Sequence, residues 1–140
     1  VDNDYRLWIN QLVERYSSCQ IRATVKAYEE LLRFYWSTGE DIIKKKAERV
    51  INSISQDLTA ALPGVKGLSP TNLGYAKRFY SLYSQLDTFY PQLVGKTEYK
   101  QLKSIIFRIL WGHQRYLIDK FYNNPKRAFY YVRLTLENGW

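Results

Sequence analysis

Hydrophobic residues recur every three or four positions along most of the chain, a spacing that predicts helices. One apolar stripe covers residues 5–16 and a second covers residues 21–35, where Trp36 and Gly39 indicate an end or a bend. Pro91 and Gly95 predict a loop. Further stripes cover residues 42–62 (one or two helical pieces), 99–110, 116–121 and 129–136, of which only 130–136 could also form a short strand. We therefore predict one all-α domain over residues 1–140, with six or seven helices.

Residues 62–83 have the pattern of a helix-turn-helix. A Pro-Gly pair ends the preceding helix, and Gly67 permits a tight turn. Ser69 is a favourable N-cap, and Pro70 stands at the first helical position, where a missing N–H costs nothing. The segment predicts a helix-turn-helix or winged-helix-like element whose second helix begins near Ser69.

This second helix has an apolar half and a polar half when it is projected at about 100° per residue. Its polar face suits nucleic acid, because cations contact phosphates while hydroxyls and amides reach base edges. A solvated helix face is the structural alternative. The predicted outer face consists of Gly74, Lys77, Arg78, Ser81, Ser84 and Gln85.

Composition narrows the class of protein. The chain of 140 residues is 46% hydrophobic and 24% charged, which is typical of a globular domain. Its net charge of +8 favours polyanionic partners such as nucleic acid or an acidic membrane surface. No apolar run is long enough for a membrane span, and no signal-peptide pattern is present, so we expect a cytoplasmic protein without a membrane partner. Cys19, the single cysteine, excludes an intrachain disulfide; we expect it to be partly buried.

Candidates for catalysis are few. His113 is the one histidine and has no nucleophile in a recognisable context beside it, so we expect a structural hydrogen bond. Glu98 and Lys100 form an E-x-K triplet with Asp87 upstream, as in PD-(D/E)XK nucleases, but outside the strand that such a metal centre needs. We predict no catalytic residue, no metal site and no cofactor.

Several short segments occur in the same order as the motifs of a known family. They are LLRFYWSTG at residues 31–39, KGLSPTNL at 66–73 with RFY at 78–80, LWGH at 110–113, and FY at 129–130 with NGW at 138–140. Over nearly the whole chain they resemble the N-terminal domain of the YhcG-type bacterial family of unknown function. The sequence departs from the pattern at Thr38 and Gly112.

The resemblance implies a helical, winged-helix-like DNA-binding module that precedes a PD-(D/E)XK nuclease domain. It carries DNA contact onto Lys66, Ser69, Thr71, Asn72, Lys77 and Arg78. The sequence ends at Trp140, where the family pattern continues towards the nuclease, so catalysis is not expected from this piece.

We therefore predict a non-enzymatic DNA-binding domain of a bacterial nuclease-like protein, with DNA contacted by the helix after Ser69. To the residues that the resemblance implies, the helical projection adds Ser81 and Gln85. The alternative is a protein–protein or homodimerisation module that uses Tyr75, Phe79 and Tyr83 of the same helix. Salt separates the two, because charge-driven DNA binding weakens steeply as salt is added and apolar association does not.

Overall fold

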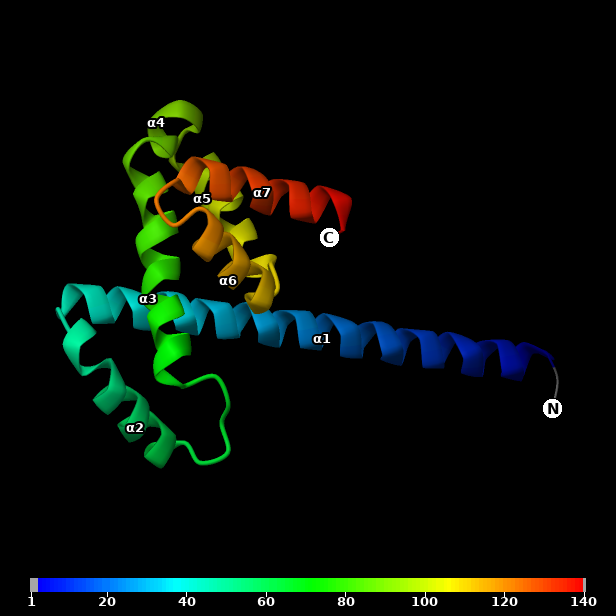
Figure 1. The fold of residues 1–140 in the computed structure, drawn as a ribbon. Coiled ribbons are helices and arrows are strands. Elements are labelled where there is room, and N and C mark those ends of the chain that lie inside the picture. The colour runs from blue at the N-terminus through cyan, green and yellow to red at the C-terminus, as the bar shows by residue number, and fades with distance from the viewer. Residues whose placement is uncertain (1–2, 140) are drawn as a thin grey trace.

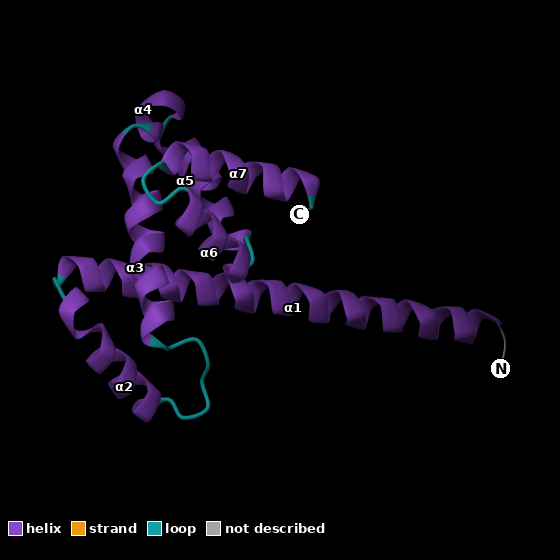
Figure 2. Cartoon of the chain, in the orientation of Figure 1, coloured by secondary structure: helices purple, strands orange, loops and turns teal. Residues whose placement is uncertain are grey.

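The computed structural model describes residues 3–139, and within that range the chain is helical with no strand (Figures 1 and 2). Trp140, part of the family-like C-terminal segment, lies outside the described residues. The prediction of an all-α domain is confirmed. The α-helices are α1 (Asn3–Lys44), α2 (Ile51–Ala61), α3 (Pro70–Ser84), α4 (Tyr90–Val94), α5 (Lys96–Lys103), α6 (Trp111–Lys120) and α7 (Pro125–Asn138), with short 3-10 turns η1 (Glu48–Val50), η2 (Gln85–Thr88) and η3 (Ser104–Arg108).

The described chain has the helix pair α2–α3 but no β-hairpin that could act as a wing. The one segment that could have competed as a strand, residues 130–136, lies within α7. Asn124 caps that helix by accepting a hydrogen bond from Arg127 N at 3.2 Å, and Gly139 ends it in a left-handed conformation. These two caps favour the helix over the strand.

Helix α1 runs without interruption through the predicted end or bend at Trp36 and Gly39. Gly39 is buried where α1 crosses α3, and a Cβ atom there would overlap the carbonyl oxygen of Ala76. The glycine therefore permits a close crossing and does not end the helix. The predicted loop around Pro91 also contains a short helix, α4, because proline is tolerated in a first helical turn.

Helix α3 is the centre of the domain. It crosses α1 on one side and packs against α2, α6 and α7 on the others (Figure 1). Phe79 is completely buried at this centre, and four aromatic rings meet it edge to face. Their centroids lie 5.3–6.0 Å from that of Phe79; they belong to Trp36, Tyr83, Phe107 and Trp111.

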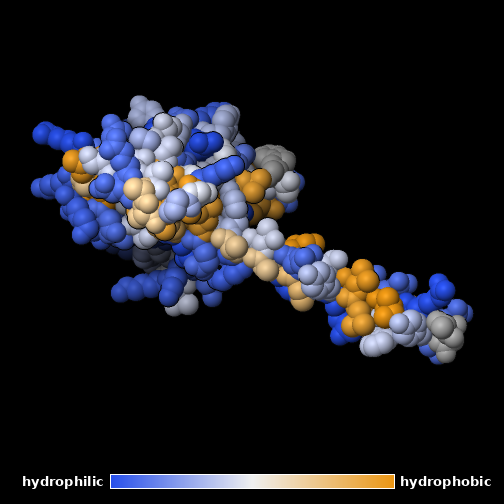
Figure 3. Space-filling view, turned by 90° about the horizontal axis from the view of Figure 1, so that it is seen from below, coloured by the Kyte–Doolittle hydropathy of each residue, from blue (hydrophilic) through white to orange (hydrophobic). Residues whose placement is uncertain are grey.

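The N-terminal part of α1 extends beyond the rest of the domain (Figures 1 and 3). We call residues 3–27 the arm; none of them is buried. Cys19 was expected to be partly buried but is exposed, because it lies on the arm and not on the core-facing part of α1. No helix in the described range is sufficiently long and apolar to span a bilayer.

Candidate nucleic-acid interface

The turn before α3 is built as its sequence predicts. Gly67 has φ of +89°, a left-handed conformation that disfavours side chains with a Cβ. A Cβ at Gly67 would also overlap the hydroxyl of Tyr35. Ser69 caps α3 by accepting a hydrogen bond from Asn72 N at 3.1 Å, and Pro70 follows in the first turn. The direction in which α3 leaves the turn is thereby fixed.

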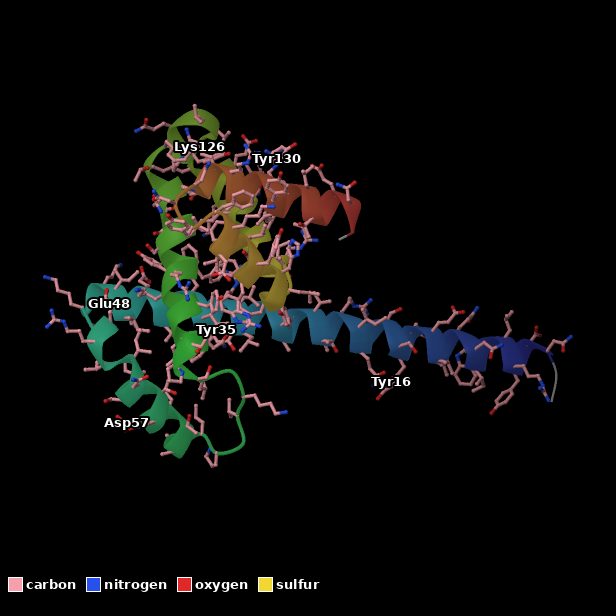
Figure 4. The ribbon with its side chains drawn as sticks, in the orientation of Figure 1. Tyr16, Tyr35, Glu48, Asp57, Lys126 and Tyr130 are labelled. Carbon is pink, nitrogen blue, oxygen red and sulfur yellow. The ribbon has the colours of Figure 1, made fainter. Side chains whose placement is uncertain are left out.

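Side chains of other helices hold this turn in place. Ser55 of α2 donates to the carbonyl of Leu68 at 2.7 Å, and Tyr35 of α1 donates to the carbonyl of Gly67 at 3.4 Å. Figure 4 shows Tyr35 close to the crossing of α1 and α3. The ring of Tyr35 stacks on Trp111 of α6, with centroids 4.5 Å apart. The turn is therefore tied to three helices besides α3.

Asn72 is part of this internal support. It is 7% exposed, and both ends of its amide are bonded within the domain. Nδ2 donates to the carbonyl of Gly67 at 2.7 Å, while Oδ1 accepts from the indole Nε1 of Trp111 at 2.7 Å. The resemblance implied a DNA contact for Asn72, whereas its side chain points into the domain because it bridges the turn and α6.

The outer face of α3 matches the helical projection. Thr71, Arg78, Ser81 and Gln85 are exposed, and Gly74, Lys77 and Ser84 are half-buried. Seen along the axis, Lys77 and Arg78 lie near the two edges of this polar arc, and the Ser81 hydroxyl and the Gln85 amide lie between them. Helix α3 contains no carboxylate. Lys66 and Ser69 are exposed beside its N-terminus, although Ser69 is engaged as the cap.

The edge at Arg78 faces α6. The guanidinium of Arg78 lies 4.3 Å from the ring centroid of Tyr75 and 3.5 Å from Asp119 Oδ1. Tyr75 donates to Asp119 Oδ2 at 2.6 Å, and this hydrogen bond raises the pKa of the Tyr75 hydroxyl. The guanidinium of Arg115, on α6, also lies near this ring, 5.5 Å from the Tyr75 centroid. Two cations and one carboxylate leave this edge with net positive charge.

A second basic cluster, which the sequence analysis missed, lies on the side of α3 that carries Lys77. Beyond Tyr80, which packs on Trp36, a pocket of about 300 Å³ lies between α1, α5 and η3. Two of its cations sit on aromatic rings: Arg33 lies 4.3 Å from the centroid of Phe107, and Lys103 lies 4.7 Å from that of Trp36. We call it the basic–aromatic pocket; it is lined by Arg33, Trp36, Lys100, Lys103, Ser104 and Phe107.

The basic–aromatic pocket left only a partial signal in the sequence. Arg33 and Trp36 are three residues apart, as are Lys100 and Lys103, so each pair shares a helix face. Only the fold brings the two pairs together. Asp87 partly balances the charge, because Lys103 Nζ lies 2.9 Å from its Oδ1.

The alternative prediction, a protein interface that uses Phe79 and Tyr83, does not agree with the position of these side chains. Both side chains are completely buried. Burial raises the pKa of Tyr83, whose protonated hydroxyl donates to Gln114 Oε1 at 2.7 Å. Tyr75 is half-buried and bonded to Asp119. A partner could not reach this apolar edge of α3 without opening the core.

The residues considered for catalysis do not converge. His113 Nε2 shares a hydrogen bond of 3.1 Å with Thr135 Oγ1, which is the structural role expected of it. Glu98 and Lys100 lie on α5 and not on a strand, while Asp87 is bonded to Lys103 and Tyr99. Among residues 3–139, no group of three or more metal-ligating side chains is gathered.

A family model for the DUF1016 N-terminal domain matches residues 11–140. The chain belongs to this family, which is the YhcG-type family that the sequence motifs indicated. No curated protein and no solved structure matches the chain.

Proposed function

We propose that this DUF1016 N-terminal domain binds DNA through the outer face of α3. The observation that carries the proposal is the composition of that face: two cations near its edges, the polar side chains of Ser81 and Gln85 between them, and no carboxylate on the helix. Phosphates suit the edges, and base edges suit the polar centre. The bonded turn supports the same function, because it holds α3 in one orientation before any ligand arrives.

The surroundings of α3 add positive charge on both sides. Arg115 lies beside the Arg78 edge, and the cations of the basic–aromatic pocket lie beyond the Lys77 edge. These positions suit a phosphate backbone that passes on either side of a helix in a groove. In this proposal the domain positions DNA and has no catalytic role, as part of a bacterial nuclease-like protein in the cytoplasm.

The test removes the two edge cations. Lys77→Ala together with Arg78→Ala should weaken binding to a duplex by about 1–3 kcal/mol and reduce the salt slope by about two. Arg127→Ala with Arg133→Ala is the matched control, because it removes two exposed cations from α7. Fluorescence anisotropy at several salt concentrations measures both effects. Equal losses in the two double variants would mean that net charge, and not α3, determines binding.

A further inference from the structure

The arm exposes large apolar side chains to solvent. Trp8, Val13 and Tyr16 each keep more than half of their surface exposed. Seen from below, apolar residues gather on the arm well away from the rest of the domain (Figure 3). A contiguous apolar surface of this kind marks an interaction site.

Residues along one side of the arm follow the spacing of a coiled coil. Positions four and three residues apart alternate along one side of the arm, which is the a/d repeat of a heptad. We call these positions the seam: Tyr5, Ile9, Leu12, Tyr16, Cys19 and Ala23. Trp8 and Val13 stand on either side of the seam, at the g and e positions, and widen it.

The seam faces away from α6 and α7 of its own chain. Cys19 and Tyr28 are nine residues apart and therefore point in opposite directions. Tyr28 packs against the core, and its hydroxyl accepts a hydrogen bond from Trp111 N. In Figure 4, Tyr16 likewise points from the arm to the side away from α6 and α7. The domain therefore cannot cover the seam with its own helices.

We propose that the seam pairs with the seam of a second copy, in a parallel, in-register two-stranded coiled coil. The arm is roughly 36 Å long at 1.5 Å per residue. A half-exposed aromatic ring offers on the order of 100 Å². The seam and its two flanking residues therefore offer several hundred Å² per helix, close to the roughly 800 Å² per partner of a stable interface.

Charge and shape favour the parallel arrangement. In parallel, Trp8 meets Val13 of the second copy, and Arg15 meets Gln20 of the second copy. An antiparallel pair with the same overlap would place the two copies of Arg15 beside each other, which is unfavourable. Because the seam faces away from α6 and α7, these two helices of each copy lie on the outer side of a parallel pair. Helix α2 contacts α1 from Phe34 onward, beyond the arm, so the proposed coiled coil is confined to the arm.

The first experiment measures mass in solution. Multi-angle light scattering at tens of micromolar should give twice the chain mass of 16.7 kDa. Leu12→Glu with Tyr16→Glu should weaken the dimer by at least tenfold and give the mass of one chain. Leu7→Glu is the matched control and should stay dimeric, because Leu7 is exposed nine residues before Tyr16 and so faces the other way. A parent chain that is monomeric at about 100 μM, or a double variant that stays dimeric, would overturn the proposal.

The second experiment tests the register. Parallel pairing brings the two Cys19 side chains within disulfide distance. Diamide, which takes two electrons and two protons from two thiols, should therefore link the chains on a non-reducing gel. Cys19→Ser with Ser18→Cys moves the thiol off the seam and should abolish the link. A dimer that Cys19 does not cross-link would overturn the parallel register. Neither experiment contains DNA, so its outcome is separate from that of the DNA proposal.

Discussion

Replacing Asn72 with alanine should destabilise the domain through two lost hydrogen bonds. The indole N–H of Trp111 would lose its acceptor in a buried position, which costs about 1–3 kcal/mol. The carbonyl of Gly67 would lose its 2.7 Å donor and keep only the longer bond from Tyr35, which costs about 1 kcal/mol more. The sum is about 2–4 kcal/mol, which corresponds to a melting temperature roughly 10 °C lower.

Thermal and urea unfolding measure this loss of stability. A double-mutant cycle with Trp111 then shows how much of it comes from the hydrogen bond between Asn72 and Trp111. Trp111→Phe removes the N–H donor while it keeps an aromatic ring against Tyr35. The two substitutions together should cost less than the sum of the single costs, because either one removes the same hydrogen bond. Additive costs would refute the bridge between the turn and α6. A variant Asn72→Ala that melts like the parent but fails to bind DNA would instead make Asn72 a contact residue.

Substitutions at three further positions test the fold, and one assay tests for catalysis. Gly67→Val should cost at least about 2 kcal/mol in urea unfolding, since φ is +89° there; an unchanged midpoint would refute the left-handed turn. Ser69→Ala should cost about 1 kcal/mol through the lost cap, and Ser69→Asp, which can still cap, should recover most of it. Gly39→Ala should destabilise by about 1–3 kcal/mol in spite of alanine's higher helix propensity, because its Cβ meets the Ala76 carbonyl; a more stable variant would refute the close crossing. Supercoiled plasmid with Mg²⁺ should stay intact on a gel; nicking that disappears in Glu98→Gln would show a catalytic centre.

Local rules were sufficient to predict where α3 begins and how the turn before it is built. A cap, a proline and a glycine act on the backbone within a few residues, so Ser69, Pro70 and Gly67 could be interpreted from sequence order. The outer face followed from the helical period for the same reason. Asn72 could not be placed, because its two partners belong to the turn and to α6 and only the fold brings them together.

The length of α1 was misjudged for a different physical reason. Gly39 was interpreted as an end or a bend because glycine is typical of helix ends, whereas the fold places Ala76 of α3 against it, where a missing Cβ permits a close crossing. The apolar stripe at residues 5–16 and the stripe at 21–35 lie on different sides of this one helix. The core-facing stripe packs against α3, and the first stripe belongs to the arm. Likewise, the basic–aromatic pocket joins residues of α1 to residues of α5 and η3, so spacing along the chain could not reveal it.

The support of the turn by several helices affects how the domain opens. Side chains from α1, α2 and α6 contribute to holding residues 67–72, so α3 cannot loosen at its N-terminus while these helices stay in place. The side-chain N–H groups of Asn72 and Trp111 should then exchange with solvent only when the whole domain unfolds. For the same reason α2 and α3 are not a portable motif: cut out as a peptide, they would lose the Tyr35 and Trp111 side chains that define their angle, and the helix pair would not persist alone.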